Sequence, residues 1–460
     1  MSRLIYPNLD LLVYQLREGF GDDEATLKAN HQAFWQNLPE ELRNPTPLAT
    51  HADNLSASAL SIADLSFRQE AEAPRLDYCE LLPLANLSKS TYPFPEISQG
   101  IYPIQGYYYP VRIEDTYALL FDCYQNDPHG IVDIKTSFEA LKTVASNKTG
   151  NLGKIWLLSG ILPQDLTDNL QQLAQDSYNA LDLGKGEVKP AGKFCGASCF
   201  EVWNYPRRWQ SIDENIHVLI VFFPNLETAK NMANAYRYWL RLFAYRSKII
   251  WAYLQTREIK RRLQDSYKII FNLAKTLNQL NLVGYENSLQ TLAETLSSYV
   301  QNLNYLEIQL NTLKVNLYNY QKTLKDLSEK FPETQLTELS HFIEIVKEKY
   351  QAQIESDIAS LSPGLRVLED LINSIRGKIE IQRAKSDRNL NYIIAGASIG
   401  LAASSVTAAL LSTQLDEPEE PISLTEGFVW SLSPILLFVL IAIVGWYRGQ
   451  RRRKSRETDD

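Results

Sequence analysis

The residues whose types and spacing come nearest to known chemistry are two cysteines in the middle of the chain. Cys195 and Cys199 are separated by three residues, a spacing at which two thiolates can bind one zinc ion. A structural zinc site needs four ligands, and neither a second cysteine pair nor a histidine lies near them in the sequence. We therefore predict two half-buried thiols on a strand and a turn, and no metal site.

A second segment, residues 185–193, contains glycines and lysines but lacks the GxxxxGK[ST] spacing that surrounds a phosphate with backbone amides. The motifs of a nucleophile elbow, a zinc protease and a dinucleotide fold are also absent from the sequence. These observations predict no catalytic residue and no cofactor. We interpret the chain as a non-enzymatic protein.

The strongest candidate for binding lies between residues 236 and 262, where basic and aromatic side chains are interleaved around a single acid, Glu258. Such a segment suits a nucleotide or a single-stranded nucleic acid, because bases stack on the rings and phosphates pair with the cations. It equally suits a helix that buries its rings on a sheet and pairs its arginines with acids of the N-terminal region. The candidate ligand-binding residues are Arg237, Arg241, Arg246, Trp239 and Tyr245.

These residues must be positioned by the N-terminal region, residues 1–225, which we interpret as an α+β or α/β sheet domain. Runs of β-branched and aromatic residues predict strands, and wider apolar periodicity predicts helices. The predicted strands are residues 118–124, 154–161, 194–203 and 215–223, and the predicted helices are residues 11–36 and 164–181. Residues 42–104, rich in Pro, Ser and Asn, are predicted to form a long irregular segment.

Residues 226–388 are predicted to form an almost continuous helical stalk. Apolar residues recur there at alternating spacings of three and four, which is the seam of a left-handed coiled coil. One seam runs from Leu289 to Phe331. A second seam runs from Leu336 to Ile379 and slips by one stutter at Ile354.

Two breaks, at residues 281–285 and 331–334, divide this region into three antiparallel passes of similar length. Packing within one chain is the plainer interpretation of the two seams. Because a coiled-coil seam also serves association between subunits, a homo-oligomer formed through the stalk is the alternative.

Two segments without a charged residue, 390–411 and 428–447, each have about the ~20 residues that a helix needs to cross a bilayer. Basic residues flank their outer ends and an acidic loop separates them, so the positive-inside rule places both termini in the cytoplasm. We therefore predict a two-helix transmembrane hairpin over residues 389–447 in the inner membrane. A basic cytoplasmic tail, residues 448–460, follows it.

Small side chains recur at every fourth position of the first predicted span, which allows two helices to approach closely. This ridge is expected to pack against the second span or between subunits of an oligomer. Its members are Gly396, Gly400, Ser404, Ala408 and Ser412.

A sheet domain, a long helix leading into two spans, an acidic outer loop and a basic tail together resemble the layout of CorA-type metal-ion transporters. Residues 385–391 look like the approach to the pore helix of that family. The resemblance implies an ion channel or a divalent-cation transporter. The family's Gly-Met-Asn signature is absent, however, because Met1 and Met232 are the only methionines of the chain.

The sequence thus predicts a membrane-anchored sensor, scaffold or effector whose cytoplasmic domain binds a protein or a nucleotide. We expect the lipid bilayer to be a partner of this protein. The alternative function is that of a divergent CorA-like channel or transporter. The formal net charge of −8 argues against a surface that binds nucleic acid throughout. Four cysteines in 460 residues indicate a reducing compartment.

Overall fold

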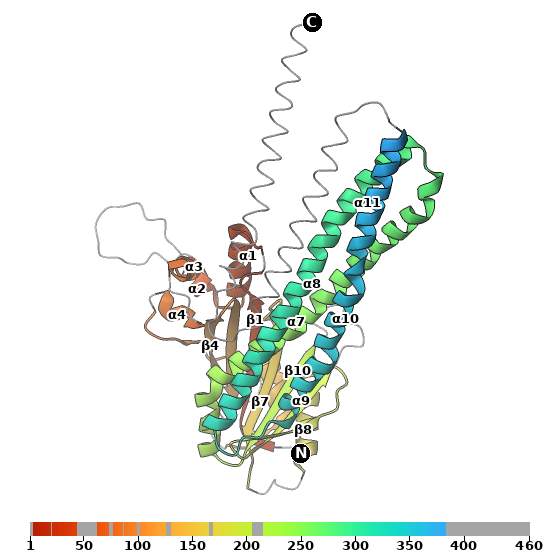
Figure 1. Cartoon of the computed structure of the whole chain (residues 1–460). Coiled ribbons are helices and arrows are strands. Elements are labelled where there is room, and N and C mark those ends of the chain that lie inside the picture. Colours follow the sequence, from red (N-terminus) through yellow and green to blue (C-terminus); the bar gives the residue numbers. More distant parts are fainter. Residues whose placement is uncertain are drawn as a thin grey trace, which may run out of the picture. The chain divides into compact units, whose positions relative to one another are not determined.

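The computed structural model describes residues 3–19, 21–43, 62–72, 77–85, 87–98, 102–125, 130–164, 169–204 and 215–382 (Figure 1). The chain forms two compact units. Among the described residues, the first contains those within 1–258 and 306–357, and the second contains residues 259–305 and 358–382.

The first unit is built on a ten-stranded mixed sheet. Its main path, in spatial order, is β2 (Tyr78–Glu80), β4 (Ile104–Ile113), β5 (Thr116–Gln125), β1 (Arg3–Leu16), β7 (Gly153–Ile161), β10 (Ile216–Phe223), β9 (Ala197–Asn204) and β8 (Lys189–Phe194). Two short strands lie off this path, β3 (Tyr92–Pro93) beside β4 and β6 (Val132–Asp133) beside β1. Only β7 and β10 run parallel among the paired strands described.

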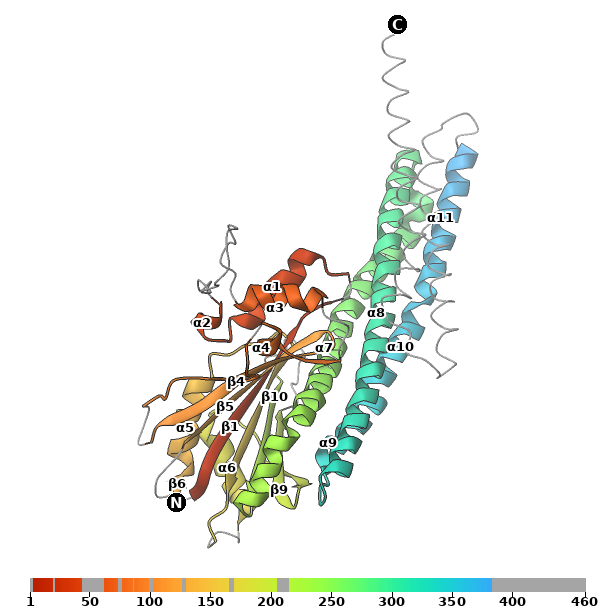
Figure 2. The ribbon, with the colours of Figure 1, turned by 90° about the vertical axis from the view of Figure 1, so that its left-hand side faces the viewer.

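One face of the sheet packs against α1 (Glu24–Trp35), α5 (Ile134–Ala145) and α6 (Leu170–Ala180), as Figure 2 shows. Side chains alternate between the two faces of a strand, so Leu9 and Leu11 of β1 enter this core while Asp10 and Leu12 point to the other face. Three short helices complete this side, namely α2 (Glu40–Arg43), α3 (Ile62–Glu72) and α4 (Leu81–Leu84).

The opposite face of the sheet is covered by the first part of a long helix, α7 (Leu226–Thr276). Tyr14 of β1 donates a hydrogen bond of 3.1 Å to the Leu240 carbonyl, and the His217 ring of β10 meets the edge of Phe243 at 5.3 Å. This interface therefore contains polar groups as well as apolar ones.

After α7 the chain is helical nearly throughout. The elements are a single 3-10 turn η2 (Leu277–Gln279), α8 (Leu282–Lys330), α9 (Thr337–Ile345), a π-helical segment η3 (Val346–Gln351), α10 (Ala352–Leu361) and α11 (Pro363–Gln382). The prediction of an α+β sheet domain followed by long helices is confirmed. The predicted breaks near residues 281 and 331 coincide with the ends of helices.

Contacts within each unit give the directions of these helices. In the first unit, Tyr320 of α8 donates to the Leu339 carbonyl of α9 at 2.9 Å, while the Tyr253 ring of α7 stacks on Tyr350 at 4.2 Å. In the second unit, Tyr299 of α8 donates to the Leu361 carbonyl at 2.7 Å. Lys314 of α8 also pairs with Glu355 of α10 at 2.9 Å in the first unit, so residue numbers rise from α9 to α10 as they fall in α8, and the segments are antiparallel.

The predicted seam of α8 is buried, because its residues from Leu289 to Phe331 are at most 9% exposed. The stutter predicted at Ile354 follows directly on the π-helical segment η3. A π-helix has more residues per turn than an α-helix, and it keeps both Tyr350 and Ile354 buried across the slip. The seam of α8 is thus filled within the chain.

Several local predictions were wrong. Residues 11–16 belong to strand β1 and not to a helix, because both faces of this central strand are buried and the apolar run has no strand-like alternation. The predicted strand 194–203 begins too early, because strand β9 starts at Ala197 and residues 195–196 form the turn that joins it to β8. Residues 42–104 contain α3, β2, α4 and β3 in their described part.

The membrane-based predictions also need correction. Among the described residues, no helix has both the length and the apolar character needed to cross a bilayer. This finding contradicts the predicted membrane-anchored sensor or effector, the CorA-like channel and the multi-pass inner-membrane location. The predicted spans at 390–411 and 428–447, the ridge residues Gly396, Gly400, Ser404, Ala408 and Ser412, and the tail 448–460 lie outside the described residues.

Candidate ligand-binding cavity

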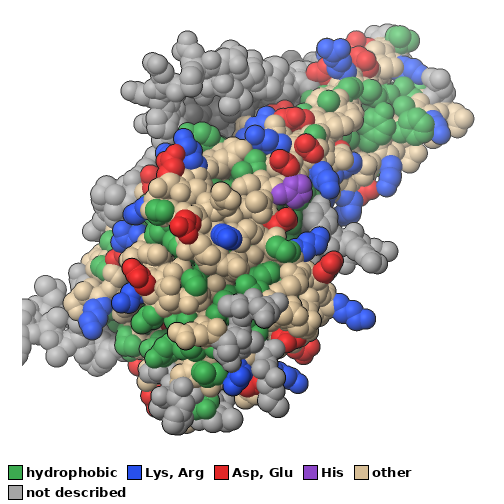
Figure 3. Space-filling view, turned by 90° about the horizontal axis from the view of Figure 1, so that it is seen from below, with side chains coloured by type: hydrophobic (Ala, Val, Ile, Leu, Met, Phe, Trp, Pro, Cys, Tyr) green, Lys and Arg blue, Asp and Glu red, His purple; other side chains and the backbone are tan. Residues whose placement is uncertain are grey.

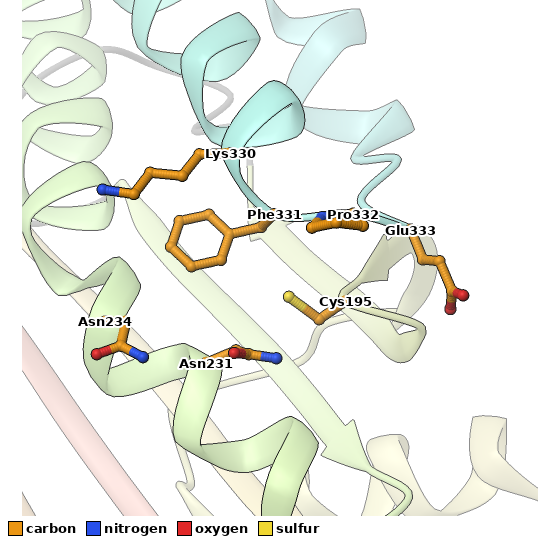
Figure 4. A pocket seen from close by; sticks show the side chains of 7 residues that line it. All are labelled: Cys195, Asn231, Asn234, Lys330, Phe331, Pro332 and Glu333. Atoms are coloured by element: carbon orange, nitrogen blue, oxygen red, sulfur yellow. The ribbon is translucent and has the colours of Figure 1, made fainter.

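A cavity of about 600 Å³ lies in the first unit beside the turn between β8 and β9 (Figure 4). Small-molecule sites typically measure ~300–1,000 Å³, so its size suits a small ligand. The turn, α7 and the end of α8 each contribute to the lining. The lining residues are Cys195, Asn231, Asn234, Lys330, Phe331, Pro332 and Glu333.

The turn that carries Cys195 is tight. Cys195 and Gly196 have φ angles of 49° and 79°, so two consecutive residues are left-handed, as in the turns that join the strands of a two-residue hairpin. Glu333, across the cavity, has a φ of 56°. Left-handed residues other than glycine are uncommon and concentrate at functional sites, and two of them line this one cavity.

Residues 331–336, here called the latch, connect α8 to α9 and run along the outer edge of β8. The Lys193 amide donates to the Gln335 carbonyl at 2.7 Å, and the Gln335 amide donates back to the Lys193 carbonyl at 2.8 Å. Two further bonds hold the same segment: Gly196 N to Glu333 O at 3.0 Å, and Cys195 N to Thr334 Oγ1 at 3.1 Å. The latch therefore docks on β8 as a very short added strand.

Gly192 makes this docking possible. Its φ is +114°, and a Cβ atom placed there would lie 1.9 Å from the Gln335 carbonyl oxygen. Both the backbone angle and the close approach therefore require glycine.

The latch begins with an aromatic anchor. The Phe331 ring packs against Phe194 at 5.6 Å and against Tyr238 at 5.9 Å. The Lys330 ammonium lies 5.2 Å from the centre of the Tyr238 ring. Neither Lys330 nor Glu333 forms an ion pair within the part of the chain that the structure describes. Figure 4 shows these two charged side chains on opposite sides of Cys195.

The Cys195 thiol is a weak nucleophile. Burial raises its pKa, and hydrogen bonding with Thr334 and Asn231 only partly offsets this effect. The thiol is therefore neutral at physiological pH, and the lining contains no histidine that could remove its proton. The arrangement can hold a ligand through hydrogen bonds and charge, but it lacks an activated nucleophile.

Three of the five sequence-predicted binding residues lie on one face of α7. Arg237 pairs with Glu80 at 2.6 Å, and Tyr245 donates to Glu114 at 3.2 Å. The guanidinium groups of Arg237 and Arg241 lie 5.3 and 5.1 Å from the centre of the Tyr78 ring. These side chains thus contact acids and a ring of the N-terminal region.

The other two predicted residues face a different part of the first unit. Trp239 is fully buried and stacks on Phe243 at 5.7 Å. Arg246 is also fully buried, with its guanidinium 4.4 Å from the Trp203 ring centre and 4.6 Å from that of Phe342. The structure therefore does not bring the five residues together, and ligand binding by them stays a prediction.

The surface agrees with this dispersal of the basic side chains. On the described part of the face in Figure 3, acidic and basic side chains are interspersed and no broad basic area is visible. A groove for a nucleic-acid strand would need a continuous basic track.

Sequence reasoning missed the polar lining of the cavity. Asn231 and Lys330 are far apart in the chain, and no motif spacing relates them. Two signals were visible: the break at residues 331–334 and the expected turn at Cys195. Only the fold shows that these two turns lie side by side.

The cysteines and acids give no sign of a metal centre in the described residues. All four cysteines are free thiols, and no group of three or more His, Cys, Asp or Glu side chains within the described ranges is placed to hold a metal ion.

Comparisons with known protein families, with curated proteins and with solved structures find no match. The resemblance in layout to CorA-type transporters is not tested by them. Function must therefore be inferred from the chemistry of the cavity itself.

Proposed function

We propose that the chain is a binding protein, and not an enzyme, that takes a small polar ligand with one anionic group in the cavity beside the β8–β9 turn. The observation that carries this proposal is the lining itself. It combines the Lys330 ammonium, which has no ion-pair partner in the described part of the chain, with the amides of Asn231 and Asn234. A carboxylate or a phosphate would pair with Lys330 while its neighbouring polar atoms bond to the amides.

The charge of Glu333 limits which ligands fit. Its carboxylate lies on the far side of Cys195 from Lys330 (Figure 4), so a ligand with anionic groups at both ends would meet repulsion there. A ligand that is anionic at one end and neutral or cationic at the other suits both charges. Amino acids and mononucleotides that place their phosphate at Lys330 belong to this class.

A thermal-shift screen tests the proposal on the purified full chain. Amino acids, mononucleotides and dicarboxylates are each added at millimolar concentration. We expect at least one compound with a single anionic end to raise the Tm, because a ligand that binds only the folded state stabilises it. Dicarboxylates should have the smallest effect.

Two lysine variants on α8 then locate the binding site. Lys330→Ala should abolish the shift, whereas Lys322→Ala, an exposed lysine outside the lining, should retain it. If no compound raises the Tm, or if Lys330→Ala binds as well as the wild type, the cavity is not the binding site.

Association between copies of the chain is a separate proposal. The α8 seam is buried within the chain, so an oligomer would have to use other surfaces. Tyr267 and Phe271, one turn apart on α7 in the second unit, are 44% and 51% exposed and offer an apolar strip. Light scattering coupled to size-exclusion chromatography tests it, since a monomer at all concentrations would reject it.

A further inference from the structure

We propose that the latch, residues 331–336, is a gate of the cavity: it detaches from β8 together with α9, and its docked state is the one that binds ligand. The part of this inference that concerns ligand rests on the proposed function. The detachment itself rests on the docking geometry alone.

The first argument is that one short segment serves two purposes. Phe331, Pro332 and Glu333 line the cavity, while Glu333, Thr334 and Gln335 make the bonds to β8 and its turn. A ligand that contacts the lining must therefore stabilise the docked latch. By thermodynamic linkage, a change that detaches the latch must weaken ligand binding by the same factor.

The second argument is that few hydrogen bonds join the latch to β8 and its turn. Four hydrogen bonds join the latch to Lys193, Cys195 and Gly196. The left-handed backbone of Glu333 opposes them, because such an angle is unfavourable for a residue with a side chain. Segments held by a few hydrogen bonds open locally without global unfolding, and here the burial of Phe331 and Leu336 adds to the cost of opening.

The third argument comes from Arg246, which lies beneath α9. Its guanidinium is clamped between Trp203 of β9 and Phe342 of α9, and none of its three nitrogens has a hydrogen-bond partner in the described chain. Its nearest carboxylate oxygen belongs to Glu201, at 3.9 Å. A buried guanidinium without hydrogen bonds is costly. Water would reach it if α9 moved away, so Arg246 favours detachment.

Cys195 supplies a direct readout of the gate. It is half-buried at the cavity, whereas Cys79, Cys123 and Cys199 are at most 7% exposed. The increase in the rate at which N-ethylmaleimide labels Cys195 over the wild-type rate, measured by peptide mass spectrometry on the full chain, reports how much more often a variant's latch is open. Amide exchange at Lys193 and Gln335 reports the same opening independently.

Two glycine variants test the gate with matched backbone strain. Gly192→Ala places a Cβ against the Gln335 carbonyl, whereas Gly184→Ala, at a φ of +95°, meets nothing within 4 Å. We expect Gly192→Ala to speed the labelling of Cys195 by roughly tenfold or more, and Gly184→Ala to leave it within roughly twofold of the wild type. Amide protection at Gln335 should fall only in the first variant.

Two further variants keep the test decisive if Gly192→Ala does not fold. Thr334→Val removes the bond to the Cys195 amide and should speed labelling by roughly fivefold. Arg246→Met fills the same space without a charge and should slow it. Unchanged labelling in both Gly192→Ala and Thr334→Val, or in Thr334→Val alone if the first is unfolded, overturns the gate. Because these experiments use no ligand, their failure leaves the proposed ligand site standing, and a failed ligand screen leaves the gate standing.

Discussion

Asp10 of β1 and Asp122 of β5 lie directly opposite each other on neighbouring central strands, and both carboxyl groups are buried beneath α7. Tyr236 of α7 donates to Asp10 at 3.0 Å, and Asn8 donates to Asp122 at 2.9 Å. Burial raises the pKa of both carboxyl groups, and the neighbouring Asp122 carboxylate raises the pKa of Asp10 further. Two interacting buried carboxyls disfavour ionisation of both at once, so we expect one of the pair to keep its proton at neutral pH.

We therefore expect Asp10→Asn to stabilise the protein at neutral and alkaline pH. The folded-state pKa of Asp10 lies above its unfolded value, so its contribution is complete at acidic pH and is lost as pH rises through the folded pKa. The amide removes this loss. Urea denaturation at pH 5, 7 and 9 should show a gain of roughly 1–3 kcal/mol over wild type that grows with pH. Asp370→Asn, at an exposed position on α11, serves as the control and should change little.

Because of His217, we expect the free energy of unfolding to fall in acid. Burial, with a contribution from the charge of Arg246, lowers its pKa to about 4. Because the folded pKa lies below the unfolded value of about 6.5, stability is complete above that value and falls as pH drops toward 4. The expected loss is on the order of 3 kcal/mol.

Replacing the imidazole tests this acid loss. His217→Gln can still donate to Glu201 but cannot take up a proton, so its stability should decline less between pH 6.5 and 4. His341→Gln, at an exposed position on α9, should follow the wild type. The ion pairing of Glu201 with His217 and Arg246 also weakens in acid, because these two partners lower the pKa of Glu201 despite its burial. A wild-type slope in His217→Gln would contradict the assignment to His217.

Gly364 of α11 should tolerate no side chain. An added Cβ would lie 2.3 Å from the Tyr299 hydroxyl, which donates to the Leu361 carbonyl just before Pro363. We expect Gly364→Ala to lower the free energy of unfolding by roughly 1–3 kcal/mol. Thermal denaturation of the full chain measures this change.

A second glycine on the same helix is the matched control. Gly377 has nothing within 4 Å of an added Cβ, so Gly377→Ala should stabilise by roughly 0.5–1 kcal/mol through helix propensity. Adding Tyr299→Phe to Gly364→Ala should restore part of the lost stability, because the clash involves the hydroxyl oxygen. If both alanine variants destabilise equally, the close approach to Tyr299 is not the cause.

Two arginines of α7 should differ in their contribution to stability. Arg257 pairs with Asp357 at 2.6 Å where the two side chains are 22% and 5% exposed, whereas Arg237 is 64% exposed in its pair with Glu80. Breaking the first pair leaves a buried carboxylate, so Arg257→Ala should cost about 2 kcal/mol or more. Arg237→Ala should cost under about 1 kcal/mol. Chemical denaturation of both variants measures the two losses in the free energy of unfolding. Equal losses would contradict the argument from the difference in burial.

The helical half of the fold was predictable because its signal is local. Leu289 to Phe331 keep one spacing along one helix, and burial follows that spacing directly. Strand β1 was not predictable in the same way: Leu11, Leu12 and Val13 are consecutive buried residues, and such a run does not distinguish a central strand from a helix.

The cavity and the burial of Arg246 were also not predictable from the sequence, and the reason is different. The sequence places Arg246 in a basic helix, but its burial depends on Trp203 and Phe342. Trp203 lies more than forty residues before Arg246, and Phe342 lies about a hundred residues after it. Asn231 and Lys330 line one cavity because the end of β8 lies beside the end of α8. Contacts of this kind depend on the packing of whole elements and leave no periodicity to detect.

The docked latch also affects how the protein meets other copies of itself. Strand β8 ends the sheet, and an uncovered terminal strand invites another chain to extend it, which is how fibrils begin. The pairing of Gln335 with Lys193 blocks that extension with the protein's own backbone. Opening of the latch would uncover the edge of β8, so the conditions that favour opening should also favour aggregation. A latch that stays open would require a partner strand on β8 in its place.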